Sequence, residues 1–205
     1  MSELTITLNQ ILDFVAKENQ DIIREFNLGL TVSEIEEIVE VLPFKLTNEV
    51  IDLYSWRDGT SSSVTDIIAH SFFLPLNEAV GIYEEMMPLD IIDQNNNDSY
   101  FWQVAWFPIL TMDQDYYFVS CRNDESAGKV YKYFIAGGEP EPMFSNLTIM
   151  MKAILDCYQT GVYKIDPEST ILSLIDEFEE KKIFAKNDPD NEFWKTYFEI
   201  PRRWD

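Results

Sequence analysis

Hydrophobic residues in the first third of the chain recur every three or four positions, a spacing that places them on one face of a helix. Charged and polar residues fill the positions between them, and residues that favour helix caps precede the runs. The pattern therefore predicts three helices at the start of the chain. They are expected from the capping box of Thr7 and Gln10 to Gly29, from Ser33 to Pro43, and from Thr47 to Arg57.

Aromatic and β-branched residues dominate the middle of the chain, in runs separated by polar turns, which is typical of strands. A short strand is expected at 71–76, followed by a helix that Asn77 caps and Pro88 ends. A polar connector is expected at 93–99. The longer strands are predicted at 100–110, 116–121 and 129–135.

Helical periodicity returns towards the end of the chain. Ser145 is expected to cap a helix that ends before Gly161, and Asp166-Pro167 is expected to start another. The segment 191–205 is too aromatic for a disordered tail, so it is predicted to dock on the body of the protein. Helices that flank a group of strands indicate an α+β fold, with a central, mostly antiparallel sheet of about 4–6 strands packed against helices.

The charge of the chain indicates which kinds of partner it can bind. It carries 37 acidic and 15 basic residues, a formal charge of −22. Between Thr31 and Ser120 there are sixteen acidic residues and only two basic ones, Lys45 and Arg57, which leaves −14 in this segment. Such a field repels nucleic acid and anionic membranes and favours a basic protein partner. Alternatively, the acidity only keeps the protein soluble.

The residue types that most enzyme sites require are scarce. His70 is the only histidine, so a Ser-His-Asp or Cys-His arrangement or a zinc site has almost no ligands to draw on. Cys121 and Cys157 form no C-x-x-C motif and no disulfide framework. No catalytic residue, cofactor or metal ligand is therefore predicted, and the chain is interpreted as non-enzymatic.

The start of the chain lacks the basic and continuously apolar regions of a signal peptide. The uninterrupted apolar runs are far shorter than the roughly 20 residues that span a bilayer. A soluble, cytoplasmic protein without a membrane partner is expected.

The stretch 104–119, VAWFPILTMDQDYYFV, has two apolar runs split by a polar segment that carries Asp113 and Asp115. A D-x-D pair could hold a hard cation in a metal-dependent hydrolase, together with Asp98. The same residues fit a loop of about 3–5 residues between two antiparallel strands. The hairpin is the preferred interpretation.

Several motifs then occur in an order that resembles one known family, the SUKH superfamily of Smi/Knr-like domains, bacterial immunity-protein type. The resemblance covers residues 31–160, with residues 1–30 as an N-terminal helix and 161–205 as a C-terminal helical extension of a single domain, 1–205. The motifs are Leu42-Pro43, the run from Leu53 to Gly59, FFLPLNEAVGIYEE at 72–85, WFPI at 106–109, GKVYKYF at 128–134 and MFSNLTIMMKAIL at 143–155.

The resemblance implies an α+β domain without a known catalytic constellation. Bacterial members include immunity proteins that bind and neutralise a toxin, often a nuclease, and fungal members act as regulatory scaffolds. The chain is therefore expected to be an acidic binding protein that neutralises a basic, nuclease-type toxin, or alternatively a Smi/Knr-type scaffold. The residues expected at the partner-binding site are Trp56, Asp58, Trp106, Asp113 and Asp115. Core packing is the alternative for Trp56 and Trp106, and it is the preferred interpretation for Trp106.

Overall fold

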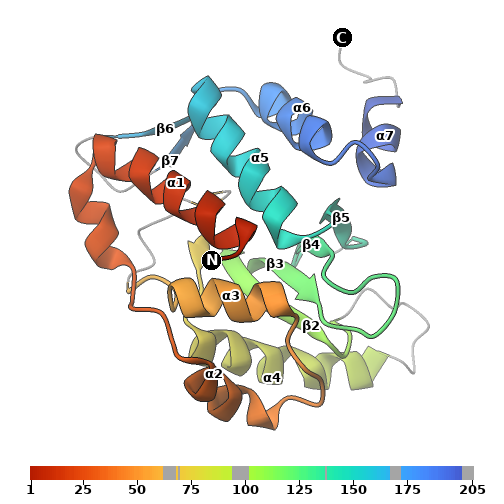
Figure 1. Ribbon diagram of the computed structural model, residues 1–205. Coiled ribbons are helices and arrows are strands. Elements are labelled where there is room, and N and C mark those ends of the chain that lie inside the picture. The colour runs from red at the N-terminus through yellow and green to blue at the C-terminus, as the bar shows by residue number, and fades with distance from the viewer. Residues whose placement is uncertain (62–67, 69, 94–101, 137, 167–171, 200–205) are drawn as a thin grey trace.

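A computed structural model of the chain describes residues 1–61, 68, 70–93, 102–136, 138–166 and 172–199. Of the polar connector at 93–99, only Asp93 lies within the described residues, and Asp98 lies outside them. The described part confirms the α+β class, with a five-stranded antiparallel sheet and helices packed against it (Figure 1).

The N-terminal part is helical, as predicted, but its helices begin and end elsewhere. Ser2, not Thr7, caps the first helix, because its side chain accepts a hydrogen bond from the Thr5 N–H. The capping box lies instead at Thr31 and Glu34, and Thr47 caps the third α-helix as expected. The elements are α1 (Glu3–Glu18), the 3-10 helix η1 (Gln20–Glu25), α2 (Val32–Ile38), the 3-10 helix η2 (Val39–Val41) and α3 (Asn48–Trp56).

The central sheet follows the order of the chain, β1-β2-β3-β4-β5, and all its pairs are antiparallel. The long strand predicted at 100–110 begins only at Trp106. The helix after β1 continues past Pro88, where the sequence predicted its end. The elements are β1 (Phe72–Phe73), α4 (Leu76–Asp93), β2 (Trp106–Met112), β3 (Asp115–Ser120), β4 (Val130–Tyr133) and β5 (Glu141–Phe144).

The acidic hairpin turn is tighter than predicted. Asp113 and Gln114 both have positive φ, 51° and 71°, and Met112 pairs directly with Asp115. These are the features of a two-residue type I′ turn, which suits the right-handed twist of a hairpin. The predicted hairpin, with its acidic turn from Met112 to Asp115, is therefore confirmed, but only two residues lie between the strands instead of 3–5, and Asp115 already belongs to β3.

The C-terminal part contains strands as well as helices. A hairpin of β6 (Tyr163–Ile165) and β7 (Leu172–Leu174) occupies the region where Asp166-Pro167 was expected to start a helix. Asn146, rather than Ser145, caps α5 (Leu147–Thr160), and Gly161 ends it in the left-handed conformation, as predicted. Asp176 caps α6 (Glu177–Asn187), which is followed by α7 (Glu192–Glu199).

Helices surround the sheet on more than one side. Helices α1 and α5 pack side by side, and α3 lies between them and α4, which packs against β2 (Figure 1). Trp194 of α7 is buried and its indole N–H donates to the Met143 carbonyl at 2.7 Å, so the aromatic tail does dock on the body through α7.

Candidate functional site

Trp56 is a structural link between helices. Its indole N–H donates to Asn9 Oδ1 at 2.9 Å, and its ring meets the ring of Phe26 edge-on with centroids 5.8 Å apart. The Arg57 guanidinium lies 6.0 Å from the same ring. The half-buried Trp56 thus attaches α3 to α1 and to the residue that follows η1.

Asp58 joins α3 to the start of α4. Its Oδ1 accepts a hydrogen bond from the Leu76 N–H at 2.7 Å, and its carbonyl accepts one from the Asn27 amide at 2.8 Å. The first N–H groups of a helix have no partner within the helix, so a carboxylate in this position acts as a cap. The structure therefore gives Asp58 a role in folding.

Trp106 belongs to the core. It is 7% exposed and stacks on Phe118 with ring centroids 4.2 Å apart. Phe118 in turn stacks on Tyr131 at 5.1 Å, and the Trp102 indole N–H donates to the Trp106 carbonyl at 2.9 Å. The WFPI motif is thus part of an aromatic stack that crosses β2, β3 and β4.

Asp113 and Asp115 have different surroundings at the tip of the β2–β3 hairpin. Asp113 is exposed in the turn, whereas Asp115 Oδ1 accepts a hydrogen bond from the Ile135 N–H at 3.1 Å. Within the described part of the chain, no group of three or more His, Cys, Asp or Glu side chains is placed to hold a metal ion. The D-x-D pair therefore has no third described ligand beside it.

The five predicted residues lie on different elements, and no contact between any two of them is observed among the interactions described above. Trp56 and Asp58 lie at the end of α3, and Asp113 and Asp115 lie at the tip of the hairpin. Trp106 begins β2, and Asp113 follows the last residue of this seven-residue strand, so about 20 Å separate their backbones. A surface that no sequence pattern predicted is a better-defined candidate for a binding site.

That surface is a groove beside the loop between η2 and α3. Two neighbouring cavities of 960 and 590 Å³ share the residues Gln103, Arg122 and Asp124. The first is also lined by the loop 43–47, which follows η2 directly, and by Val104, whose side chain is exposed. No sequence pattern singled out this groove, because loops from three distant segments build it.

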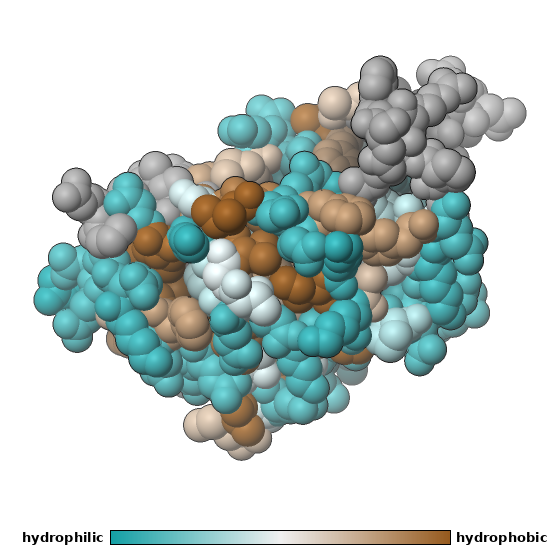
Figure 2. All heavy atoms as spheres, turned by 90° about the horizontal axis from the view of Figure 1, so that it is seen from above, coloured by the Kyte–Doolittle hydropathy of each residue, from teal (hydrophilic) through white to brown (hydrophobic). Residues whose placement is uncertain are grey.

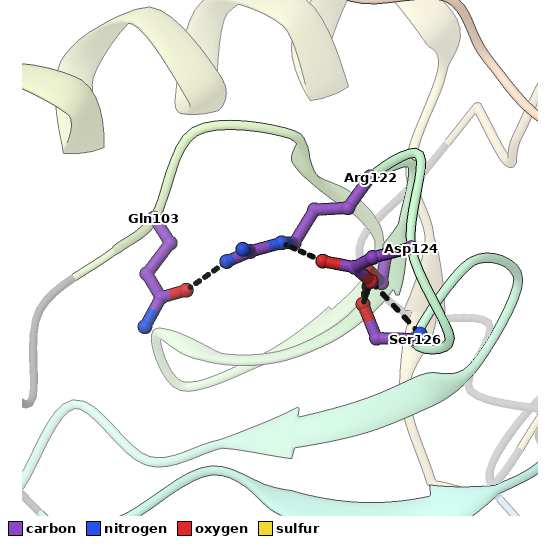
Figure 3. Close-up of polar contacts among 5 residues, drawn as sticks. Gln103, Arg122, Asp124 and Ser126 are labelled. Atoms are coloured by element: carbon purple, nitrogen blue, oxygen red, sulfur yellow. Dashed lines mark hydrogen bonds and ion pairs between the residues drawn. The ribbon is translucent and has the colours of Figure 1, made fainter.

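A polar network fixes the centre of the groove (Figure 3). Arg122 donates from Nε to Asp124 Oδ2 at 2.7 Å and from Nη1 to Gln103 Oε1 at 2.9 Å. The backbone N–H and hydroxyl of Ser126 donate to Asp124 Oδ1 at 2.8 and 2.5 Å, and these bonds lower the pKa of the Asp124 carboxyl. The network holds the 121–126 loop in place and presents Arg122 to the groove.

Cys121 lines the groove but is poorly suited to act as a nucleophile. Burial raises the pKa of its thiol to about 11, so the reactive thiolate is scarce at neutral pH.

An acidic helical face adjoins the groove. Helices α2 and α4 pack against each other at one end of the molecule (Figure 1), and neither they nor η2 contain a lysine or an arginine. The nearest basic side chain in sequence is Lys45, in the groove loop. The face is defined by its exposed carboxylates, Glu34, Glu36, Glu37, Glu40, Glu78, Glu84 and Glu85.

The opposite end of the molecule has a different character. Figure 2, which looks onto that end from above, shows hydrophobic residues gathered between hydrophilic ones. Helix α6 at this end carries Lys181, Lys182 and Lys186 as well as Glu177, Glu179 and Glu180, in contrast to the helices of the acidic helical face, which contain no lysine or arginine. The two ends of the molecule thus differ in the balance of charges that their helices carry.

Of the helices among the described residues, none combines the length and the apolar character needed to cross a membrane.

Comparison with known proteins identifies the family of the domain. The model of the SMI1 / KNR4 family (SUKH-1) matches residues 29–153, more than half of the chain, and the segment includes the acidic helical face and the groove. No curated protein matches the chain. The match agrees with the resemblance found in the motifs and with the observed α+β fold. The chain therefore belongs to the SMI1/KNR4 (SUKH-1) family.

Proposed function

We propose that the protein is a non-enzymatic binding protein whose acidic helical face captures a basic partner, and that the partner is a nuclease-type toxin that it neutralises. The observation that carries this proposal is the set of seven exposed carboxylates on α2, η2 and α4, three elements that contain no lysine or arginine. A nuclease must be basic to hold nucleic acid, so it would be steered towards this face.

The groove would supply the short-range contacts of the complex. Protein interfaces combine an apolar centre with a polar rim, and charged residues contribute more to the rate of association than to the final affinity. The groove offers the exposed Val104 in its lining, Arg122 and Asp124 at its centre, and the acidic helical face beside it. Asp113, Asp115 and Asp58 would contribute charge rather than direct contacts.

Family membership supports two versions of this proposal. An immunity protein and a Smi/Knr-type regulatory scaffold could use the same face, with a toxin or a signalling protein as the partner. The buried, free thiols of Cys121 and Cys157 agree with a reducing compartment, and we place the protein in the cytoplasm.

The test is association with a basic toxin domain encoded by a neighbouring gene, measured by stopped-flow kinetics at several salt concentrations. A double variant, Glu36→Lys/Glu37→Lys, is expected to reduce the association rate at least tenfold at low salt. The matched control is Asp190→Lys/Glu199→Lys, which changes the charge equally at two exposed positions in the C-terminal part and should have less than a twofold effect.

Three results would contradict parts of the proposal. Equal effects of the two double variants would assign the association to total charge rather than to the acidic helical face. An association rate independent of salt would remove electrostatic steering. Absence of any complex with the toxin domain would leave the scaffold version, to be tested against regulatory partners.

A further inference from the structure

A second cavity lies on the other side of the molecule, between the sheet and the C-terminal helices. It has a volume of 430 Å³, and α6 and α7 cover it. Its floor is a row of side chains across three strands, because Tyr117 of β3 pairs with Lys132 of β4, and Lys132 pairs with Glu141 of β5. The cavity is independent of the proposed partner-binding face.

One charged group of this cavity, the Lys132 ammonium, lies over aromatic rings, whereas Lys181 and Glu177 at the cavity wall form an ion pair with each other. The Lys132 ammonium lies 5.5 Å from the centre of the Tyr117 ring and 4.9 Å from that of Phe134. Within the described part of the chain, it forms no ion pair with a carboxylate closer than 4.0 Å. The floor therefore presents a positive charge that contacts aromatic rings and lies near Glu141 and Glu180 without an ion pair to either.

Two carboxyl groups border the same cavity. Glu180 of α6 is largely buried and accepts a hydrogen bond from the Tyr163 hydroxyl. Glu141 is half-buried at the other end of the floor. Burial raises the pKa of both carboxyl groups, and the ammonium groups of Lys132 and Lys181 only partly offset this effect. A cationic group placed between the two acids would stabilise their charged forms.

The remaining walls are mostly aromatic and apolar, together with His70 and the ion pair of Lys181 with Glu177. Phe184 of α6 and Phe193, Trp194 and Tyr197 of α7 line the cavity. Trp194 is held by its hydrogen bond to the Met143 carbonyl, so this wall is fixed. Pockets of a few hundred Å³ with apolar walls and a few convergent polar groups are typical of sites for small molecules.

We propose that this cavity binds a small zwitterion with an apolar body, of the class of a free aromatic or aliphatic amino acid or a dipeptide. Its carboxylate pairs with Lys132, its ammonium lies between Glu141 and Glu180, and its side chain packs against the rings of α7. A volume of 430 Å³ corresponds to about 14 water molecules, which is ample for such a ligand.

The experiment uses the full chain and follows tryptophan fluorescence and saturation-transfer NMR with L-phenylalanine and glycyl-L-phenylalanine as probes. Both probes are expected to bind. L-Phenylalaninamide lacks the carboxylate and N-acetyl-L-phenylalanine lacks the ammonium, so each is expected to bind at least tenfold more weakly than L-phenylalanine.

Two variants test separately the contacts of the ligand's carboxylate and of its ammonium group. Lys132→Met should weaken binding of L-phenylalanine at least tenfold without a further effect on the amide, and Glu180→Gln should do the same without a further effect on the N-acetyl derivative. Lys164→Met, at an exposed position of β6, is the control and should bind as the wild type does.

Failure of both probes to bind at 10 mM would overturn the proposal. Binding that is equally strong for the charged and the capped probes would show a purely apolar site and would also overturn it. Neither result would affect the acidic helical face, because the experiment contains no toxin domain.

Discussion

Asp58 Oδ1 accepts a hydrogen bond from the Leu76 N–H at 2.7 Å, and this bond joins two residues that are eighteen positions apart. The bond caps α4 from a residue that follows α3. Helices α3 and α4 are thus linked by a side chain that was predicted to bind a partner.

Asp58→Ala is expected to lower the free energy of unfolding by about 1 kcal/mol, because the first turn of α4 loses its cap. Urea denaturation followed by circular dichroism measures this change. Asp58→Asn is the control, since its amide oxygen still accepts the bond and most of the stability should remain. If both variants unfolded like the wild type, the cap would have no energetic role.

Gly59, the next residue, is required by its surroundings as well as by its backbone. Its φ is +71°, and a Cβ atom here would lie 2.3 Å from the Pro75 nitrogen and 2.6 Å from the Leu74 carbonyl carbon. Both neighbours are backbone atoms, so they cannot move without a shift of the chain before α4. Gly59→Ala should therefore be severely destabilising.

Gly128 provides the matched comparison for this prediction. Its φ is +81°, but a Cβ atom there would meet nothing within 4 Å among the described residues. Gly128→Ala should cost only the strain of the left-handed conformation, about 1–2 kcal/mol. Thermal unfolding of the two variants separates the effects, and equal losses of stability would contradict the close approach at Gly59.

The local signals in the sequence located only some of the caps and ends of elements. Thr47 and Gly161 were found because their roles depend on a few neighbouring residues. The β6–β7 hairpin was missed because Ile171, Leu174, Ile175 and Phe178 fall at a helical spacing. Only the pairing of Leu172 and Leu174 with Ile165 and Tyr163 makes them strand residues. Tertiary contacts, which no local pattern contains, decided that region.

Tertiary contacts also determine the roles of the residues predicted at the candidate site. Trp106 and Asp58 were noticed for their residue types, but burial and capping, which depend on distant segments, gave them structural roles. The acidic character of the segment 31–120 was readable from composition. The groove was not, because the loop 43–47 meets Arg122 and Asp124 only in the folded chain.

Glu180 is expected to make stability depend on pH. Burial raises the pKa of its carboxyl above the ordinary value of 4.5, so the folded state binds this proton more tightly than the unfolded chain. Its contribution to stability is therefore full below pH 4.5 and is lost as the pH rises through the raised pKa. Glu180→Gln should be more stable than the wild type at neutral pH, with a difference that shrinks in acid.

Denaturant unfolding of both proteins from pH 4 to pH 8 measures that difference. Glu199→Gln removes a carboxylate at an exposed position of α7 and should stay within about 0.5 kcal/mol of the wild type at every pH. A constant gap between Glu180→Gln and the wild type across this range would contradict the raised pKa.

Asp188 connects the C-terminal helices to the domain that the family shares. It is 3% exposed, and its carboxylate accepts hydrogen bonds from the Ser145 N–H at 2.7 Å, the Ser145 hydroxyl at 2.8 Å and the Asn191 amide at 3.1 Å. Asp188→Ala leaves these part-buried donors without their acceptor, which should lower the free energy of unfolding by about 1–3 kcal/mol.

The consequence of that loss should be local as well as global. Asn191 also donates to the Pro142 carbonyl at 2.9 Å, so the bonds of Asp188 and Asn191 together hold the start of α7 against β5. Hydrogen exchange of Asp188→Ala should therefore show faster exchange in α7 and β5 than in α2 and α3. Asp190→Ala, at an exposed position two residues away, should leave the exchange of all four elements unchanged. Uniformly faster exchange across the domain would show instead that α7 unfolds only together with the rest of the chain.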